Sequence, residues 1–222
     1  KTTRESKKYQ LRGEILSFIP VEKNVEVMLV TITNTGRMAQ TVTPTAAIPL
    51  YGRSADNIRD HRHVTSLLHR IETTDIGVLV TPTLSFDERG HQVNHMTYYC
   101  VGWSGNGEKP VDFYPTAEDF VGEGGNFERP YAIVKNAEGV KAGTRIEGLE
   151  AVGGLHFSEV TLEPEEECSY LIFTGITEDI QEIRNLSKTY TTREMVLEEL
   201  EKTKAYWQEK VNVAYHTGDS DF

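Results

Sequence analysis

An eleven-residue segment, Asn24-Val25-Glu26-Val27-Met28-Leu29-Val30-Thr31-Ile32-Thr33-Asn34, carries the clearest secondary-structure signal in the chain. Val25, Val27 and Leu29 share one face of an extended chain, because side chains alternate between the two faces of a strand. This period of two, together with many β-branched residues, predicts a half-buried β-strand. The tripeptide Asn34-Thr35-Gly36 has the composition of a turn. The segment therefore predicts a strand followed by a turn.

The same signature recurs along most of the chain. After Tyr9, the residues Leu11 and Ile15 alternate with Arg12 and Glu14, which predicts an earlier strand. Further short strands are expected at residues 40–45, 76–82, 96–103, 131–134, 155–162 and 169–174. Clusters rich in glycine, proline and asparagine separate them. Many short strands without intervening helices predict a mainly β protein, an antiparallel β-sandwich rather than βαβ units.

The two ends of the chain lie outside this pattern. Residues 1–8 are charged and lack periodicity, so we expect a frayed lead-in. Near the other end the period becomes helical: Thr177 is placed to cap a short helix, and Thr191 with Glu194 fits a capping box that starts a second. The expected apolar stripe of the second helix consists of Leu197, Leu200, Trp207 and Val211. We therefore divide the chain into a β-sandwich over residues 1–176 and a helical brace or linker over residues 177–222.

The composition is that of a soluble globular protein. Of the 222 residues, 38% are hydrophobic and 26% are charged, and no charge-free stretch approaches the roughly 20 residues that span a bilayer. We expect neither a signal peptide nor a membrane partner. Because the formal net charge of −11 repels phosphate backbones, we also expect no nucleic-acid partner.

The cysteines indicate a reducing compartment. Cys100 and Cys168 are too few for a disulfide framework or a zinc cage by themselves, and both occur in apolar, strand-like runs. We interpret them as buried reduced thiols of a cytoplasmic protein. The chain begins with Lys1 rather than Met and ends at Phe222 without a helix stop, which we interpret as a piece of a longer protein.

The densest polar stretch lies between Tyr51 and Arg70, and its apolar pair Leu67-Leu68 places it at an edge of the sheet. Planar Arg guanidinium groups and His rings hydrogen-bond well to sugar hydroxyls, carboxylates and phosphate. We therefore predict a substrate-binding edge formed by Arg53, Arg59, Asp60, His61, Arg62 and His63. One alternative is a solvated, salt-bridged loop. Another is a metal pair of His61 and His63, for which no third ligand is evident nearby.

Other constellations predict neither catalysis nor a metal site. Asp87 and Glu88 are adjacent, whereas inverting sugar chemistry needs two carboxyl groups from different parts of a fold, so we predict a hydrophilic hairpin tip. The glycine clusters lack the Lys-Ser/Thr of a phosphate loop, and neither cysteine has the sequence context of a nucleophile. Sugars stack on aromatic rings, yet we interpret the dense aromatic set as packing residues. The set consists of Tyr98, Tyr99, Trp103, Phe113, Tyr114, Phe120 and Phe127.

Several short motifs occur in a suggestive order. Besides the polar stretch, they are Val30-Thr31-Ile32-Thr33-Asn34, Gly122-Glu123-Gly124-Gly125-Asn126-Phe127-Glu128-Arg129-Pro130, Leu162-Glu163-Pro164-Glu165-Glu166-Glu167 with Leu171-Ile172-Phe173-Thr174-Gly175, and Tyr206-Trp207. From about Tyr9 onward, the chain resembles the N-terminal β-sandwich domain of cellobiose-phosphorylase-like glycoside phosphorylases, that is, glycoside hydrolase family 94 and its relatives.

The resemblance implies a galactose-mutarotase-like super-sandwich followed by C-terminal α-helices. It also implies a parent enzyme that cleaves a β-linked glucoside with inorganic phosphate as co-substrate and releases a sugar 1-phosphate with inversion. In such enzymes the general acid and the phosphate site belong to an (α/α)₆ barrel that follows the sandwich and a helical linker. We therefore expect no catalytic residue and no cofactor here, and the start of the module is expected to be missing, which would leave the sandwich incompletely closed.

The expected partners are a β-linked gluco-oligosaccharide, the catalytic barrel of the same parent chain, and a second copy in a homodimer. Two other functions stay open. The chain can be a free-standing carbohydrate-binding domain that works through its aromatic residues and the Arg/His segment. Alternatively, the polar segment can serve as a subunit interface.

Overall fold

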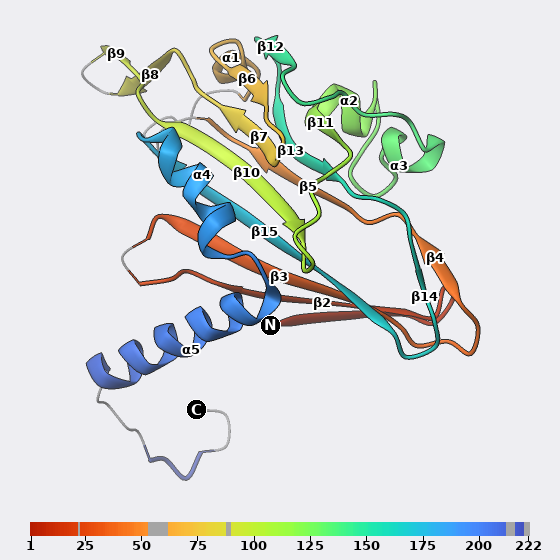
Figure 1. The fold of residues 1–222 in the computed structure, drawn as a ribbon. Helices are drawn as coiled ribbons and strands as arrows, with labels where there is room; N and C mark the ends of the chain where they lie inside the picture. The colour runs from red at the N-terminus through yellow and green to blue at the C-terminus, as the bar shows by residue number, and fades with distance from the viewer. Residues whose placement is uncertain (22, 53–61, 88–89, 212–215, 220–222) are drawn as a thin grey trace.

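The computed structural model describes residues 1–21, 23–52, 62–87, 90–211 and 216–219. Within these residues, two β-sheets pack face to face and helices cover the other side of the larger sheet (Figure 1). The strands described as paired are antiparallel to their neighbours. The predicted fold class, an antiparallel β-sandwich followed by helices, is confirmed.

The larger sheet has eight strands in the described part of the chain. In spatial order they are β1 (Thr2–Ser6), β2 (Leu11–Phe18), β3 (Val25–Asn34), β15 (Glu167–Thr177), β10 (Thr97–Ser104), β7 (Gly77–Val80), β6 (Arg70–Thr73) and β12 (Arg145–Glu147). A second sheet lies over β7 and β10 and consists of β11 (Asp112–Thr116), β13 (Ala151–His156) and β5 (Thr45–Leu50).

Smaller elements surround these two layers. The short pairs are β4 (Gln40–Val42) with β14 (Val160–Leu162), and β8 (Leu84–Asp87) with β9 (Gly90–Val93). The helices are α1 (Arg62–Ser66), α2 (Ala117–Val121), α3 (Tyr131–Lys135), α4 (Ile180–Thr189) and α5 (Arg193–Lys210). No helix in the described ranges is long and apolar enough to cross a membrane.

Strand β3 shows how one sheet supports two cores. Its residues Val25, Val27 and Leu29 belong to a buried cluster that also contains side chains of α4 and α5. Met28 and Val30, which alternate with them, pack against the cluster on the opposite face, beneath the second sheet. The residues that alternate in the sequence of β3 therefore point in turn to the face covered by helices and to the face covered by the second sheet.

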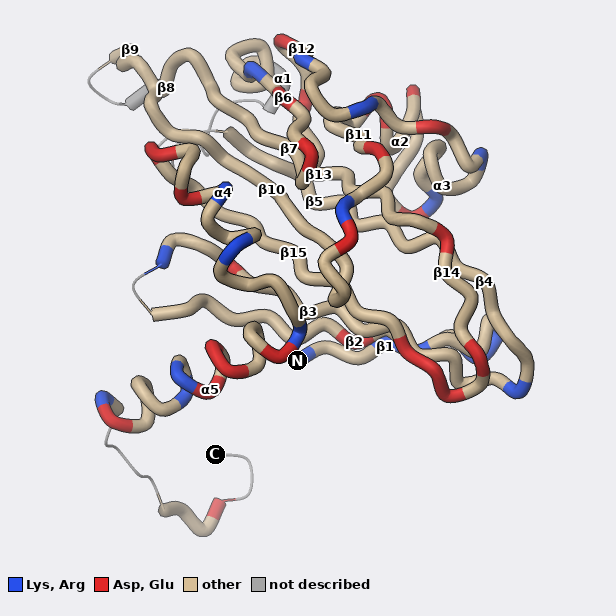
Figure 2. Tube along the Cα trace, in the orientation of Figure 1, with Lys and Arg blue, Asp and Glu red and all other residues tan. Residues whose placement is uncertain are grey.

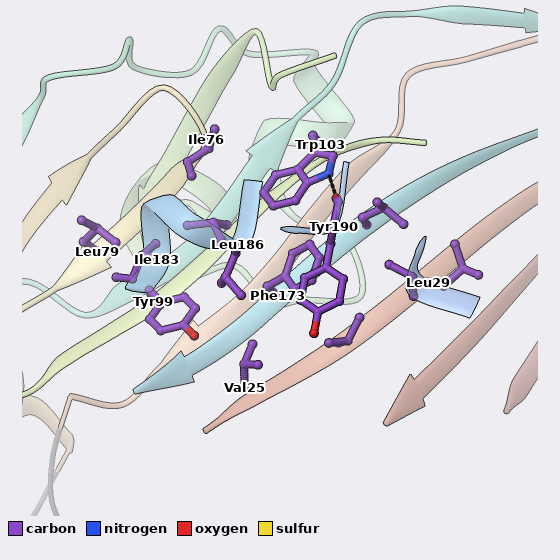
Figure 3. Close-up of a cluster of buried hydrophobic side chains, with 14 residues drawn as sticks. Val25, Leu29, Ile76, Leu79, Tyr99, Trp103, Phe173, Ile183, Leu186 and Tyr190 are labelled. Carbon is purple, nitrogen blue, oxygen red and sulfur yellow. Dashed lines mark hydrogen bonds between the residues drawn. The ribbon is translucent and has the colours of Figure 1, made fainter. Parts of the chain in front are cut away.

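The helix-covered core is centred on stacked aromatic rings (Figure 3). The ring centroids of Trp103 and Phe173 are 4.8 Å apart, and those of Phe173 and Tyr190 are 5.5 Å apart. Lys23 contacts the Tyr190 end of this stack. Its Nζ donates a hydrogen bond to the Tyr190 hydroxyl at 2.6 Å and lies 4.7 Å from the centroid of the Tyr190 ring. These contacts join the end of α4 to the middle of the sheet.

The second sheet approaches the first closely where β13 crosses β10. A Cβ at Gly153 would lie 2.2 Å from Cys100 Cβ, so this position requires glycine. Farther along, an apolar groove of about 260 Å³ separates β5 from the β3–β15 part of the larger sheet. Met28 and Val30 line the groove and are only half-buried, unlike Cys100, which is fully buried. The second sheet thus covers β7 and β10 more completely than β2 and β3.

The strand predictions at residues 24–34, 76–82, 96–103 and 169–174 are confirmed by β3, β7, β10 and β15. The segments 40–45 and 155–162 each contain two strands instead of one. β4 ends at Val42 and β5 begins at Thr45, and the Pro44 carbonyl between them accepts a hydrogen bond from the Phe157 amide at 3.0 Å. The breaks in both segments therefore lie side by side.

Two predictions about local structure are wrong. Residues 131–134 form helix α3 and not a strand, with Pro130 as its N-cap and Asn136 in the left-handed conformation as its C-cap. This apolar run is too short to show a period, and proline before it with asparagine after it favours a helical turn. The expected lead-in instead forms β1, which pairs with β2 from Thr2 opposite Ile15.

The two C-terminal helices differ in detail from their predictions. Asp179, not Thr177, is the N-cap of α4, while Thr177 donates to the Glu182 carboxylate at 2.5 Å. The capping box at Thr191 is wrong, since Thr192 occupies the N-cap position of α5.

The predicted apolar stripe of α5 holds only in its first half. Val196, Leu200 and Thr203 are buried, whereas Trp207 and Val211 are exposed. The exposure of these two residues agrees with the path of the helix, because the second half of α5 extends away from the sheet (Figure 1).

Charge is unevenly placed on this framework. Figure 2 shows acidic residues gathered at the hairpin between β14 and β15, which contains Glu163, Glu165, Glu166 and Glu167. This acidic segment joins the end of β14 at Leu162 to the start of β15 at Glu167.

Candidate functional site

The predicted substrate-binding residues fall almost entirely outside the described residues. Arg53, Arg59, Asp60 and His61 lie outside them, and Arg62 and His63 begin α1 with side chains that are also outside the described part. Their role therefore stays a prediction. The residues on either side of this segment are described, and they define where its two ends lie.

Both ends of the segment meet at one small pocket. Tyr51, at its start, and Ser66, at its end, line a hollow of about 20 Å³, which is room for about one water molecule. The pocket is completed by Pro49, Leu50, Thr65, His69, Ala117, Phe127, Glu150, Ala151 and Val152. The pairing of Ala151 with Leu50 across β13 and β5 brings these parts of the chain together.

His69 anchors the inner side of this pocket. Its ring is buried, and Nδ1 lies 3.1 Å from the Leu149 carbonyl oxygen, so Nδ1 carries the proton in the neutral ring. Nε2 is buried beside Gly52 and has no hydrogen-bond partner among the described residues.

Burial lowers the pKa of His69 below its ordinary value of 6.5. The carbonyls of Leu149 and Gly52 and the charge of Glu150 act in the opposite direction but are smaller effects. The ring is therefore uncharged at neutral pH, and it lines the pocket as a polar but neutral group.

Two aromatic side chains at this pocket are available to solvent. Tyr51 and Phe127 each expose 48% of their surface. Phe127 is held by the buried ring of Phe120 at a centroid distance of 5.8 Å, and Phe120 in turn packs on Tyr114 at 5.8 Å. The loop that carries Phe127 is fixed by Asn126, whose Oδ1 accepts hydrogen bonds from the backbone amides of Glu128 and Arg129.

A wider groove adjoins the pocket on the other side of Phe127. It has a volume of about 500 Å³ and shares Phe127, Ala117 and Glu150 with the pocket. Glu118, Glu123 and Asn126 also line it. Ionised carboxylates accept hydrogen bonds from hydroxyl groups, and an aromatic face packs against apolar C–H groups. Such a surface can bind a polyhydroxy ligand without carrying out chemistry on it.

The predicted Arg/His segment stays untested, and the described residues beside it include three that the sequence does not single out for binding. The sequence predicts a packing role for Phe127 and no binding role for Tyr51 or Glu150. The available signal was the position of Phe127 directly after Gly124-Gly125-Asn126, where a turn exposes the next side chain. The packing interpretation is confirmed for the buried members of the aromatic set, namely Tyr99, Trp103, Phe113, Tyr114 and Phe120.

Asp112 and His156 form a polar pair, largely buried from solvent, elsewhere in the described structure. They face each other across β11 and β13, with His156 Nδ1 2.6 Å from Asp112 Oδ1. Lys141 Nζ lies 3.9 Å from the other carboxylate oxygen. No hydroxyl or thiol of a described residue hydrogen-bonds to His156, so the pair lacks the nucleophile of a catalytic triad and acts as a cross-strand contact.

The remaining candidates are structural. Asp87 pairs with Gly90 in the β8–β9 hairpin, as predicted for a hairpin tip, while Glu88 lies outside the described residues. Cys100 and Cys168 are free thiols, and burial raises the pKa of Cys100 to about 12. Among the described residues, no group of three or more His, Cys, Asp or Glu side chains is arranged to hold a metal ion.

A large antiparallel sheet, a smaller sheet on one face and helices on the other define a super-sandwich protein with a polar, aromatic edge. Residues 1–193 match the family described as glycosyl hydrolase 94, supersandwich domain, and the chain belongs to this family. The resemblance predicted from the sequence is thereby confirmed. No curated protein matches the chain. The family membership indicates a non-catalytic module of a glycosyl hydrolase 94 enzyme.

Proposed function

We propose that this chain is the N-terminal non-catalytic module of an inverting glycoside phosphorylase and forms one edge of its sugar cleft. The parent enzyme would convert a β-linked glucoside and inorganic phosphate into a sugar 1-phosphate. One observation carries the proposal: within a chain of this family, the exposed rings of Tyr51 and Phe127 border one pocket at the base of the Arg/His segment.

The chemistry of this edge fits a gluco-oligosaccharide. The rings of Tyr51 and Phe127 offer faces for the apolar C–H side of a pyranose. Glu150 and Glu118 offer carboxylate oxygens that accept hydrogen bonds from sugar hydroxyls. In the proposal, the guanidinium groups of Arg53, Arg59 and Arg62 supply hydrogen-bond donors to the sugar.

The reaction itself is assigned to another part of the parent protein. The general acid and the phosphate site would belong to an (α/α)₆ barrel, and the module would pack on that barrel and contribute to a homodimer. The chain alone is then expected to be inactive in the cytoplasm, where we place the parent enzyme.

The first test is an assay of the isolated chain with cellobiose and inorganic phosphate. We expect no release of sugar 1-phosphate, with a complete cellobiose phosphorylase as the positive control. Release of sugar 1-phosphate by the purified chain would overturn the proposal, because it would place a reaction centre within these residues.

The second candidate function is that of a free-standing carbohydrate-binding domain. The half-exposed rings of Tyr51 and Phe127 favour it, since such rings bind sugars without help from another domain. Calorimetry with cello-oligosaccharides separates the two candidates. Sub-millimolar binding that disappears in Tyr51→Ala and Phe127→Ala favours the free-standing domain, whereas no binding favours the module. Tyr9→Ala is the matched control, because Tyr9 is exposed on the distant β1–β2 turn.

A further inference from the structure

A second pocket lies on the helix-covered face of the large sheet, away from the edge that carries Tyr51 and Phe127. It has a volume of about 260 Å³, close to the lower end of the roughly 300–1,000 Å³ that is typical of small-molecule sites. Its outer wall is one stripe of α4, formed by Glu182, Asn185, Leu186 and Thr189. The sheet supplies the rest, namely Lys23, Asn24, Val25, Tyr99 and Ile176.

The Tyr99 side chain is the central feature of this pocket. Only 4% of the residue is exposed, yet its hydroxyl makes no hydrogen bond to any described residue. Figure 3 shows the ring beside Ile183, with the hydroxyl directed away from Ile183 toward the side of Val25. Because the hydroxyl oxygen itself keeps contact with solvent at the pocket, a ligand or water can hydrogen-bond to it there.

The backbone around the Tyr99 hydroxyl leaves space for it. A Cβ at Gly175 would lie 2.4 Å from the hydroxyl oxygen, so any larger residue there would displace it. Burial, and secondly the charge of Glu182, raise the pKa of Tyr99 to about 12. The hydroxyl is therefore neutral at physiological pH and can both donate and accept a hydrogen bond.

The other polar groups of the pocket make it nearly neutral. The carboxylate of Glu182 accepts from the Thr177 hydroxyl through Oε2, which leaves Oε1 as an acceptor. The exposed Asn185 side chain on α4 also lines the pocket and adds two donors and an acceptor. The ammonium of Lys23 opposes the charge of Glu182, although it is already bound to Tyr190.

These features select one class of ligand. An anion would meet Glu182 and a chain of net charge −11, and a cation would meet Lys23. An apolar ligand would leave the Tyr99 hydroxyl unpaired. A polyhydroxy ring satisfies both parts of the pocket, since its hydroxyls match Tyr99 and Asn185 and its apolar face matches the floor formed by Val25.

We propose that this pocket binds a neutral polyhydroxy molecule of monosaccharide size, with the Tyr99 hydroxyl and the Asn185 amide as its principal hydrogen-bonding groups. The pocket is separate from the cleft edge, because none of its lining residues occurs at the Tyr51–Phe127 site. A bound molecule would contact both α4 and the sheet and would therefore hold this helix on the sheet.

The test is a titration of the ¹⁵N-labelled 222-residue chain with D-glucose, myo-inositol and inorganic phosphate, followed by backbone amide shifts. We expect glucose or inositol to shift the amides of Tyr99, Asn185 and Leu186 in a saturable manner, with a dissociation constant on the order of 1 mM. Phosphate is expected to leave them unchanged. Because these amides differ from those of Tyr51 and Phe127, binding here is separable from binding at the cleft edge.

Two conservative variants make the test specific. Tyr99→Phe removes only the unpaired hydroxyl, so the variant folds and its affinity is expected to fall about threefold to tenfold. Tyr98→Phe is the matched control, because Tyr98 points to the opposite face of the same strand and its affinity should equal that of the unchanged chain. Asn185→Ala, on the exposed side of α4, is expected to weaken binding to a similar extent.

Three results would overturn the proposal. The first is the absence of saturable shifts with either polyhydroxy probe, which would mean that water alone occupies the pocket. The second is equal affinity in Tyr99→Phe and Tyr98→Phe. The third is a response to phosphate but not to glucose or inositol, which would identify an anion site. None of these results bears on the proposed role of the Tyr51–Phe127 edge.

Discussion

The indole Nε1 of Trp103 donates a hydrogen bond to the backbone carbonyl of Tyr190 at 2.8 Å. Trp103 lies in the middle of the large sheet, on β10, and Tyr190 is the residue that terminates α4. Both are buried, so this hydrogen bond fixes the end of the helix inside an apolar cluster (Figure 3). The helices are thus bound to the sandwich by a specific bond as well as by apolar contact.

Loss of this bond should destabilise the chain measurably. Trp103→Phe leaves the Tyr190 carbonyl without its donor in a buried position, which costs about 1–3 kcal/mol of unfolding free energy, and the smaller ring adds a packing loss. Chemical denaturation gives the value. Trp207→Phe makes the same substitution on the exposed part of α5 and should stay within about 0.5 kcal/mol. Equal effects of the two substitutions would show that the Trp103–Tyr190 bond contributes nothing.

The closest approach of the two sheets gives a second prediction. Gly153→Ala places a Cβ 2.2 Å from Cys100 Cβ, so the layers must separate, at a cost of about 1–3 kcal/mol. Gly13→Ala is the matched control, because its Cβ would meet nothing within 4 Å. The control should be neutral or stabilised by up to about 1 kcal/mol, since alanine restricts the unfolded chain. Thermal unfolding of both variants checks the difference, and a stable Gly153→Ala would contradict the tight packing of β13 on β10.

A strand or helix could be predicted from the sequence where its hydrophobic residues show a clear period. The strand around Val27 could be predicted because its two faces enter two different cores, which forces strict alternation. The strand prediction for residues 131–134 is wrong, because the helical state of Tyr131–Lys135 depends on Pro130 and Asn136 at its ends and on the burial of Ala132 against α2. Five residues do not show a period by themselves.

Predictability of the candidate site was limited by long-range contacts. The polar segment after Tyr51 is visible in the sequence because its charges are contiguous. Phe127 and Glu150 reach the same pocket only through the packing of α2 and the pairing of β13 with β5. Such tertiary contacts leave no local mark on the residues that they bring together.

The buried ring of His69 should make stability depend on pH. Its folded-state pKa is lowered by burial, so below about pH 6.5 the unfolded chain takes up a proton on this ring before the folded chain does. The stability from this group is therefore complete above pH 6.5 and is lost as the pH falls toward the folded-state pKa. One such group contributes a slope of at most about 1.4 kcal/mol per pH unit.

Comparison with a non-titrating side chain isolates this effect. His69→Gln retains a donor for the Leu149 carbonyl but takes up no proton in this range. Between about pH 7.5 and about pH 5.5, denaturant titrations should show that the unchanged chain loses more unfolding free energy than the variant. Parallel profiles would mean that the ring titrates equally in the folded and unfolded chains.

The reactivity of the two thiols reports directly on the closure of the sandwich. Cys100 is fully buried between the sheets and its pKa is raised to about 12, so almost none of it is thiolate at pH 8. In Cys168→Ser, which leaves Cys100 as the only thiol, iodoacetamide should modify the folded chain only as fast as the chain unfolds, and should react promptly in denaturant. Peptide mass mapping measures both rates. Rapid modification under native conditions would show that the β13 layer opens from β10 without global unfolding, and the close Gly153–Cys100 contact would then be transient.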